Sequence, residues 1–268
     1  MNMKKLNVLV LILSMVLFSS CKEKKKDKVI NIDVNGVSFE VVRVEHGTFM
    51  MGTPEDSTLG AAADHERPVH EVTISKDFYM GRYPVTQKLW KAVMGGTPFA
   101  EGEQWSVEFG VGDDVPVYFV SWNDCQTFIA KLNELTGKSF RLPSESEWEY
   151  AARGGNKSKG YRYAGSDDIF EVAWFGGFMG AEKVGGKRPN ELDLYDMSGN
   201  IYEWCIDYAN YSDENHIDPI GNSPNGAAKR GGCWNAQPSG CRVSARGSAG
   251  KSQRLSLVGF RLVMEDED

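Results

Sequence analysis

Hydrophobic and polar residues alternate along the first part of the chain at the two-residue period of β-strands. The alternation over residues 30–39 is interrupted by Asn35-Gly36, a pair that favours the positive φ angles of a two-residue hairpin turn. The extended pattern continues over 41–51, and a further strand is predicted over 65–74 after a polar loop. The N-terminal part of the domain is therefore predicted to be β-structure.

Three later segments place apolar residues at the 3.6-residue period of amphipathic helices. They cover residues 86–94, 121–135 and 148–153, and glycine follows each of them closely. The third comes after a capping box at 144–147, and its glutamates are expected to complement the helix dipole rather than to act as acids or bases. Beyond residue 154, short apolar pieces separated by Gly, Asn, Asp, Pro and Ser predict loops without a further helix.

The pattern shows no internal repeat and no linker after residue 30, which predicts a single domain. The chain has 268 residues, enough to bury a sizeable core, and its 29 glycines and 11% aromatic residues indicate a loop-rich fold with large rings in the interior. A formal net charge of −7 and the lack of a basic face interleaved with aromatic residues argue against nucleic acid as a partner.

The N-terminus has the composition of a secretory signal. Lys4 and Lys5 precede an apolar stretch over 6–18 that is too short to span a membrane. Phe18-Ser19-Ser20-Cys21 resembles a bacterial lipobox, in which Cys21 would carry lipid and become the first residue of the mature chain. A plainly secreted protein is the alternative. Lipid on Cys21 predicts a protein anchored to a membrane of the bacterial cell envelope, either periplasmic or surface-exposed.

These patterns divide the chain into a lipoprotein signal peptide over 1–20, a lysine-rich spacer with the first strand over 21–36, and a folded domain over 37–266. Export also permits disulfides. If Cys21 carries lipid, an even number of cysteines remains, and four cysteines allow three pairings among which the sequence cannot choose. The four are Cys125, Cys205, Cys233 and Cys241.

The segment over 230–246 combines two thiols with three guanidinium groups. A thiol is reactive when nearby positive charge or a metal lowers its pKa. Arg230, Arg242 and Arg246 are placed to supply that charge to Cys233 and Cys241. The alternative is that the two cysteines form a structural disulfide.

A series of motifs in fixed order resembles the formylglycine-generating enzyme (sulfatase-modifying factor) family, over about residues 40 to 264. The resemblance implies a single asymmetric α+β domain with little regular secondary structure, related to the C-type lectin fold and often stabilised by calcium. The motifs are Gly47-Thr48-Phe49-Met50-Met51-Gly52, Pro84-Val85-Thr86-Gln87, Val120-Ser121-Trp122-Asn123-Asp124, Phe140-Arg141-Leu142-Pro143-Ser144-Glu145, Glu147-Trp148-Glu149-Tyr150-Ala151-Ala152-Arg153-Gly154, Leu194-Tyr195-Asp196-Met197-Ser198-Gly199-Asn200, Glu203-Trp204, Arg230-Gly231-Gly232 and Gly259-Phe260-Arg261.

The resemblance implies a calcium site near the Gly-Asn and Glu-Trp pairs. Carried over to this chain, its ligands would be the side chains of Asp196 and Glu203 with the carbonyls of Gly199 and Ile201. Carboxylate and carbonyl oxygens are the donors that Ca²⁺ prefers. The alternative is a plain turn over 196–200, closed by hydrogen bonds from Asx side chains.

The resemblance also bears on activity, because the oxidising family members bind copper with a pair of cysteines. In this chain the second position of the pair is Cys241, but the first is Ala236, and Gln237 replaces the histidine that follows it. Without the first thiol, two-coordinate ligation of Cu(I) by soft ligands is lost at that site. Cys233 offers one replacement, since it would form a displaced thiol pair with Cys241 that binds copper or acts as a disulfide switch.

Two functions from different classes follow. The first is a non-catalytic binding or assembly factor of the envelope, whose domain presents a cleft to a peptide, a glycan or an envelope protein. The second is a formylglycine-generating oxidase that converts a sulfatase cysteine to formylglycine through Cys241 and the displaced Cys233. Ala236 favours the first function.

The predicted floor of the cleft joins large aromatic rings to amides and guanidiniums, a composition suited to recognition. The alternative places the tryptophans in the core and pairs the arginines with Asp196, Asp207 or Glu203. The residues are Tyr202, Trp204, Cys233, Trp234, Asn235, Gln237, Cys241, Arg242 and Arg246.

Overall fold

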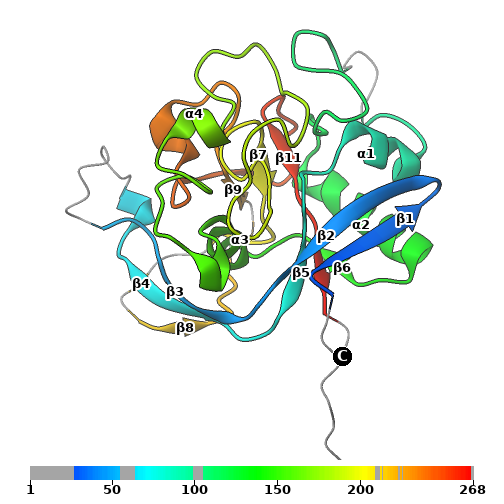
Figure 1. The fold of residues 1–268 in the computed structure, drawn as a ribbon. Coiled ribbons are helices and arrows are strands. Elements are labelled where there is room, and N and C mark those ends of the chain that lie inside the picture. The colour runs from blue at the N-terminus through cyan, green and yellow to red at the C-terminus, as the bar shows by residue number, and fades with distance from the viewer. Residues whose placement is uncertain are drawn as a thin grey trace, which may run out of the picture.

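The computed structural model describes residues 27–54, 64–98, 105–208, 212, 214–222, 224 and 226–266 (Figure 1). The predicted signal peptide, the lipobox with Cys21 and most of the lysine-rich spacer lie outside the described residues. Within the described ranges, no helix combines the length and the apolar character that crossing a membrane requires.

The predicted N-terminal hairpin is the start of a five-stranded sheet. Asn35 and Gly36 take the positive φ angles that the turn needs, 47° and 80°. The strand order is β1-β2-β5-β12-β6, and each neighbouring pair is antiparallel. The bounds are β1 (Val29–Val34), β2 (Val37–Val44), β5 (Phe78–Gly81), β12 (Val263–Glu265) and β6 (Phe140–Arg141).

Two smaller sheets complete the β-structure of the described residues. One has the order β10-β9-β7-β11 and the other β3-β4-β8, and each contains one parallel pair. The bounds are β10 (Arg246–Gly250), β9 (Gly226–Arg230), β7 (Tyr202–Trp204), β11 (Val258–Phe260), β3 (Gly47–Met51), β4 (His70–Ile74) and β8 (His216–Ile217).

Two strand predictions are wrong in their bounds. The segment over 41–51 is divided between β2 and β3, which belong to different sheets. Between β2 and β3, the carbonyl of Glu45 accepts a hydrogen bond from Tyr150, and the amide of His46 donates one to Asp77. Where the chain passes from one sheet to the other, these side chains therefore bind backbone groups that have no neighbouring strand. The strand predicted over 65–74 begins only at His70; the 3₁₀ turn η1 (Asp64–Glu66) and an irregular segment over 67–69 come before it.

The three predicted helices are present, each with a serine or threonine cap. Thr86, Ser121 and Ser144 accept hydrogen bonds from backbone amides at the start of α1, α2 and α3. The third helix starts earlier than predicted, because the capping box at Ser144 fixes its first turn. One four-residue helix, α4, lies beyond residue 154, where none was predicted. The bounds are α1 (Gln87–Met94), α2 (Trp122–Thr136), α3 (Glu145–Ala152) and α4 (Ile169–Val172).

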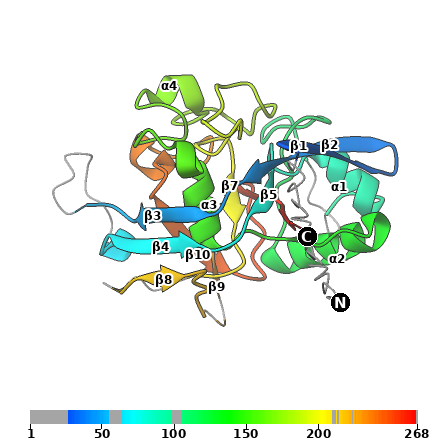
Figure 2. The ribbon, with the colours of Figure 1, turned by 60° about the horizontal axis from the view of Figure 1, so that its bottom comes forward.

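The helices pack on two sides of the sheets. Figure 2 shows α1 and α2 beside the β1–β2 hairpin, and α3 beside β3 and β4. The stacked rings of Trp90 and Phe128, 5.2 Å apart, lie in the core between α1 and α2. Leu135, predicted on the apolar face of α2, is instead 44% exposed in the last turn of the helix.

Buried ion pairs anchor α3, and they correct the expectation that its glutamates only complement the helix dipole. The buried carboxylate of Glu145 pairs with Arg230 and Arg246. That of Glu149 pairs with Arg153, 2.6 Å away, and with Arg230. Burial raises the pKa of Glu149, but the guanidiniums of Arg153 and Arg230 and the amide of Gly52 outweigh burial and lower the pKa to about 2.

Two long loops lie together at the upper end of the molecule in Figure 1. We call residues 105–119 and 173–186 the distal loops. They are joined by hydrogen bonds from the amide of Ala181 to the carbonyl of Phe109 and from Val184 to Asp114, each 2.9 Å long. A Cβ atom on Gly110, whose φ is 94°, would lie 2.2 Å from the carbonyl oxygen of Ala181, so this close contact requires glycine.

Candidate functional site

A double-glycine turn after β9 brings the segment with the two thiols back on itself. Gly231 and Gly232 have φ angles of 93° and 76°, which favour glycine. A Cβ atom on Gly232 would lie 2.6 Å from the sulfur of Cys241 and 2.8 Å from the carbonyl oxygen of Gly240. The turn therefore packs directly against Cys241, which ends the 3₁₀ turn η3 (Pro238–Cys241).

The sequence-predicted pair Cys233 and Cys241 is brought together. Both residues are buried, and the backbone at Gly232, directly before Cys233, lies against the sulfur of Cys241. The amide of Ala236 donates to the carbonyl of Cys233 at 2.9 Å and closes the turn after it. All four cysteines described by the structure are buried thiols without a disulfide, so the structural disulfide that the sequence allowed is not formed.

The thiols are not activated as the sequence suggested. Burial, reinforced by the neighbouring Cys233, raises the pKa of Cys241 to about 12 against the effect of two backbone amides. Burial also raises the pKa of Cys233, although Lys229 and two amides oppose it. At neutral pH both groups are therefore protonated thiols, and a protonated thiol is a poor nucleophile and a poor metal ligand.

The three arginines of the segment do not lower the pKa of the thiols, because each arginine forms an ion pair with a buried glutamate. Arg242 forms two hydrogen bonds of 2.9 Å with Glu66. Arg230 and Arg246 both contact Glu145. The alternative that pairs these arginines with Asp196, Asp207 or Glu203 is therefore wrong.

Six of the nine predicted cleft residues lie in the interior: Trp204, Trp234, Arg242, Arg246 and the two thiols. Arg242 and Arg246 are buried in ion pairs, and Trp204 is fully buried with its indole N–H donating to the carbonyl of Val120 at 3.0 Å. This outcome agrees with the alternative that placed tryptophan in the core. Of the other three, Tyr202 is half-buried beside the thiols, whereas Asn235 and Gln237 are exposed.

Tyr202 and Lys229 form a second titratable pair beside the thiols. The Nζ atom of Lys229 lies 3.9 Å from the centre of the Tyr202 ring. Burial raises the pKa of Tyr202 to about 12, and both thiols add to the shift. Burial lowers the pKa of Lys229, and Cys233 opposes this change. No local pattern identifies Lys229 in advance, because its place beside Tyr202 depends on the pairing of β7 with β9.

Trp234 extends from the thiols to the distal loops. It is 7% exposed and packs with Val115, Ala181 and Phe109. Its indole Nε1 atom is buried and has no hydrogen-bond partner in the structure. Asn235 and the nearby Gln237 are exposed. The indole thus lies between the two loops, while the amides face solvent.

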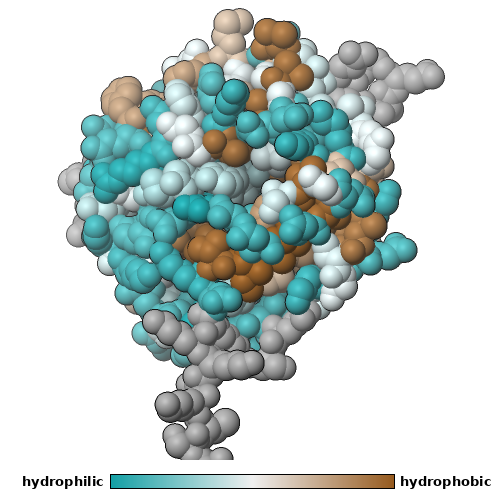
Figure 3. Space-filling model, turned by 45° about the vertical axis from the view of Figure 1, so that its right-hand side comes forward, coloured by the Kyte–Doolittle hydropathy of each residue, from teal (hydrophilic) through white to brown (hydrophobic). Residues whose placement is uncertain are grey.

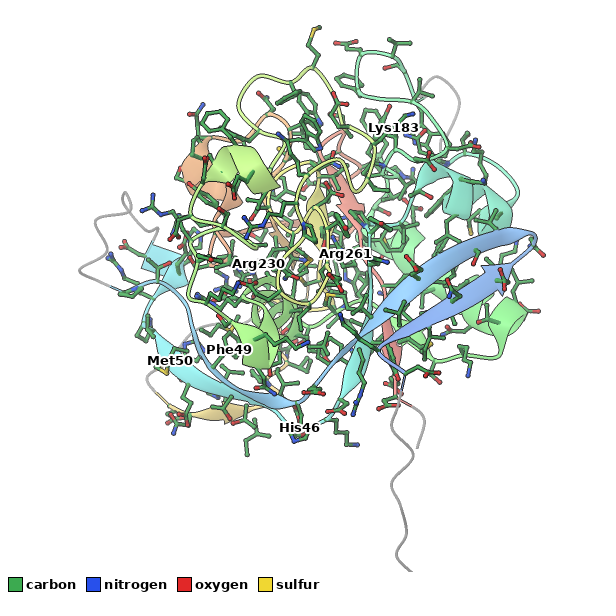
Figure 4. The ribbon with its side chains drawn as sticks, viewed as in Figure 1. His46, Phe49, Met50, Lys183, Arg230 and Arg261 are labelled. Carbon is green, nitrogen blue, oxygen red and sulfur yellow. The ribbon has the colours of Figure 1, made fainter. Side chains whose placement is uncertain are left out.

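The predicted calcium ligands do not form a cation site that includes Glu203. The carboxylate of Glu203 binds Arg261 through contacts of 2.7 and 3.0 Å and accepts the indole N–H of Trp148 at 2.7 Å. A guanidinium on both carboxylate oxygens repels a second cation. Figure 4 places Arg261 in the interior of the domain. Among the described residues, no group of three or more His, Cys, Asp or Glu side chains is arranged to hold a metal ion.

Asp196 is near enough to that ion pair to feel its charges, and it accepts a hydrogen bond of 2.8 Å from the amide of Gly185. Burial raises its pKa to about 6, although this amide and the charge of Arg261 oppose the shift. Calcium at Asp196 with the carbonyls of Gly199 and Ile201 stays a prediction. Glu203 does not fit as one of its ligands.

A charged groove of about 1660 Å³ lies away from the thiols. Its lining includes His46, which Figure 4 shows at the lower end of the molecule, whereas Lys183 of the distal loops lies at the upper end. The charges in the groove largely pair with one another, for example Arg43 with Asp77 and Arg141 with Glu147. It contains none of the predicted site residues.

A single domain of mixed helices and sheets, with two neighbouring thiols held by a double-glycine turn, defines the class of protein. The family described as sulfatase-modifying factor enzyme 1-like domain matches residues 31–266, and the chain belongs to this family. The single-domain α+β fold predicted from the resemblance is confirmed.

Among characterised relatives, the chain is 30% identical over 273 residues to chaperone protein LppX of Paenibacillus barcinonensis, covering 83% of this chain and 90% of the relative. It is 30% identical over 286 residues to the formylglycine-generating enzyme of Streptomyces coelicolor, covering 82% and 87%. A third relative, 30% identical over 235 residues and covering 67% and 74%, is the inactive C-alpha-formylglycine-generating enzyme 2 of Bos taurus. The family therefore includes members named as enzymes, as a chaperone and as inactive.

Two solved structures share the fold over nearly the whole chain. PvdO from Pseudomonas aeruginosa superposes with a TM-score of 0.74 at 28% identity and covers 91% of this chain and 100% of its own. Treponema denticola variable protein 1 superposes with a TM-score of 0.76 at 25% identity and covers 90% and 100%.

Proposed function

We propose that this protein is an exported, lipid-anchored binding or assembly factor whose domain does not generate formylglycine. The observation that carries the proposal is Ala236, which stands where the family resemblance expects the first copper-binding cysteine. Without that thiol, ligation of Cu(I) by the family's pair of soft ligands is lost at this position. The burial of Cys233 and Cys241, which raises the pKa of both thiols, supports the same conclusion.

Two relatives support a role other than catalysis. One is named a chaperone and another an inactive formylglycine-generating enzyme, each about 30% identical to this chain. The lipobox-like sequence at Cys21 supports anchoring in the envelope. A domain on such an anchor would bind a peptide, a glycan or another envelope protein.

The alternative function is oxidation of a sulfatase cysteine to formylglycine, with copper held by Cys241 and the displaced Cys233. One specific observation favours it: the two thiols are close enough for Cys233 to affect the pKa of Cys241. A pair of soft sulfur donors suits Cu(I), which would have to displace both thiol protons on binding. The relative from Streptomyces coelicolor, named as this enzyme, belongs to the same family.

An assay with copper separates the two functions. The purified, reduced domain is incubated with Cu(I), dioxygen and a peptide that contains a Cys-x-Pro-x-Arg sequence, and aldehyde is measured by mass spectrometry. The Streptomyces enzyme serves as the positive control. We expect no aldehyde from this chain. Aldehyde formation that is lost in Cys233→Ala but retained in Cys125→Ala, a cysteine in a separate core cluster, would overturn the proposal.

The anchor and the calcium prediction are tested separately. Expression with a labelled fatty acid is expected to yield a lipidated, membrane-bound protein, and Cys21→Ala is expected to abolish labelling. An unlabelled wild-type protein would contradict the anchor. For calcium, titration of the metal-free domain is expected to raise its melting temperature only if Asp196 and neighbouring carbonyls bind the ion. An identical response in Asp196→Asn would exclude that site.

A further inference from the structure

The charged groove at the lower end of the domain is lined by more carboxylates than cations. Arg43 pairs with Asp77 and Arg141 pairs with Glu147, so these four charges cancel. Beyond the two pairs, four carboxylates and two lysines line the groove. The excess of negative charge favours a positively charged occupant. The four carboxylates belong to Asp27, Asp218, Glu265 and Asp266, and the two lysines are Lys76 and Lys138.

Two of these carboxylates are exposed and only weakly neutralised. Asp218 accepts hydrogen bonds from the amide and the hydroxyl of Ser75, which carry no charge. The side chain of Glu265 is 59% exposed and lies 3.5 Å from Nε of Arg141, whose closer partner is Glu147 at 2.7 Å. A single exposed ion pair contributes little, but several pairs made by one segment act together. The groove therefore suits a segment that brings several cations.

The N-terminal part of the chain enters the domain through this groove. Asp27 lines the groove, and its carbonyl accepts a hydrogen bond of 3.2 Å from the hydroxyl of Tyr79. Tyr79 lies on β5 and pairs with Met264 of β12, directly before Glu265. Figure 1 shows the start of β1 and the end of β12 at the same lower end of the sheet. The backbone at Asp27 is therefore held beside β5, one strand away from Glu265.

The residues that precede Asp27 are rich in lysine and lie outside the described residues. An extended chain advances by about 3.3–3.6 Å per residue, so three residues cover about 10 Å. Neighbouring strands lie about 4.8 Å apart, which places β12 within reach of the lysines next to Asp27. The sequence over 22–26 is Lys22, Glu23, Lys24, Lys25 and Lys26.

We propose that the lysine-rich segment over 22–26 binds the groove of its own domain, with the ammonium groups of residues 24–26 paired to the carboxylates of Asp218 and Glu265. This inference goes beyond the proposed function and does not depend on whether the domain oxidises cysteine. A segment bound in this way shortens the connection between Cys21 and the domain. If Cys21 carries lipid, the contact turns the groove toward the membrane and sets the orientation of the domain on its anchor.

An anionic membrane surface is the competing partner of the same lysines. Lysines beside a lipid anchor are attracted to anionic headgroups. The groove has the advantage that it belongs to the same chain and adjoins the segment, which gives it a high effective concentration. Figure 3 shows hydrophilic residues along the lower edge of the domain, below an apolar area on this face. The edge next to the segment thus suits a charged occupant.

Zero-length cross-linking tests the contact directly. A carbodiimide joins an ammonium group to a carboxylate where the two are in contact, and mass spectrometry identifies the joined residues. The protein is the mature chain from residue 21 with Cys21→Ala, which keeps the lysine-rich segment. We expect links within one molecule from residues 24–26 to Asp218 or Glu265. Absence of such links, links only to carboxylates outside the groove, or links only between two molecules would overturn the inference.

Cleavage by trypsin gives a second readout, because trypsin cuts after a lysine that is accessible. The groove variant, Asp218→Asn with Glu265→Gln, keeps the size of both side chains. The matched control, Asp33→Asn with Glu108→Gln, neutralises two exposed carboxylates elsewhere. We expect cleavage after residues 24–26 to be about threefold to tenfold faster in the groove variant than in the control at low salt. The difference should vanish in about 1 M salt, where the Debye length falls to about 3 Å.

Exchange of the charges separates the ion pairs from other effects of substitution. Lys24→Glu with Lys25→Glu is expected to abolish the links from these two positions to the groove. Addition of Glu265→Lys with Asp266→Lys is expected to restore them, with the carboxylates now on the segment. Failure of the exchanged pair to link refutes the inference.

The remaining outcomes are decisive as well. Equal cleavage of the groove variant and the control, or a difference that persists in concentrated salt, refutes the inference. Protection of the lysines by phosphatidylglycerol vesicles, without protection by the groove, assigns them to the membrane and refutes it too. Aldehyde formation in the copper assay refutes the proposed function and leaves this contact unaffected.

Discussion

Replacement of Glu149 by glutamine removes one charge from the buried ion pairs of α3 and keeps the size of the side chain. The carboxylate accepts hydrogen bonds from Arg153 at 2.6 and 2.9 Å and from the amide of Gly52 at 2.9 Å, and it contacts Arg230. Glutamine has one carbonyl acceptor and adds an N–H₂ group that faces these guanidiniums. Two arginines, one of them fully buried, would lose a counterion.

The expected loss of stability follows from two independent estimates. Removing one partner of a buried ion pair typically costs about 3–5 kcal/mol. The pKa of Glu149 is lowered from 4.5 to about 2, and a shift of this size corresponds to about 3 kcal/mol at neutral pH. We therefore expect Glu149→Gln to lower the free energy of unfolding by about 3–4 kcal/mol at pH 7, and the melting temperature by roughly 10 °C.

The pH dependence makes the prediction specific. Because the folded-state pKa of Glu149 lies below the unfolded one, its stabilisation is present above about pH 4.5 and is lost as the pH falls toward 2. Urea unfolding of wild type and variant at several pH values between 2 and 7 is the assay. The difference between them is expected to shrink as the solution becomes acidic.

The matched control is Glu171→Gln. Glu171 pairs with Arg188 at 2.7 Å, but both side chains are about half exposed, so the loss is expected to stay below about 1 kcal/mol. A difference of less than about 1 kcal/mol for Glu149→Gln at pH 7, or one that is constant from pH 7 to pH 2, would refute the electrostatic argument.

Three further predictions concern the site and its surroundings. Gly232→Ala is expected to destabilise the domain by at least about 2 kcal/mol in urea unfolding, because its Cβ would lie 2.6 Å from the Cys241 sulfur at a φ of 76°; wild-type stability would contradict the tight contact. In the native protein at pH 7, the four described cysteines are expected to react with a thiol reagent at least about a hundredfold more slowly than in urea, because all are buried; fast reaction of Cys233 or Cys241 would contradict this. Burial raises the pKa of Asp207 from 3.8 to about 6, so its contribution to stability is present below about pH 4 and is lost as the pH rises through 6. Asp207→Asn is expected to flatten the stability curve in that interval, and an unchanged curve would contradict the assignment.

Several parts of the fold follow from local sequence, since their interactions connect residues a few positions apart. The Asn35-Gly36 turn and the serine and threonine caps of α1 and α2 are determined by backbone geometry and by hydrogen bonds within one turn. The hypothesis that Cys233 and Cys241 form a pair drew on their short separation in the chain, and the turns between them, closed by the hydrogen bond from Ala236 to the carbonyl of Cys233 and by η3, bring the two residues together. The motifs in fixed order predicted the family, which the comparison confirms.

The tertiary structure decided what those residues do. The partners of the arginines lie far away in the chain, since Arg230 is 81 positions from Glu149 and Arg242 is 176 from Glu66. No local pattern identifies such partners, because any of the glutamates could have served. The same packing decides the state of the thiols. The sequence places arginines near Cys233 and Cys241, but burial removes the thiols from water while distant glutamates neutralise the guanidiniums, and the pKa of each thiol rises instead of falling.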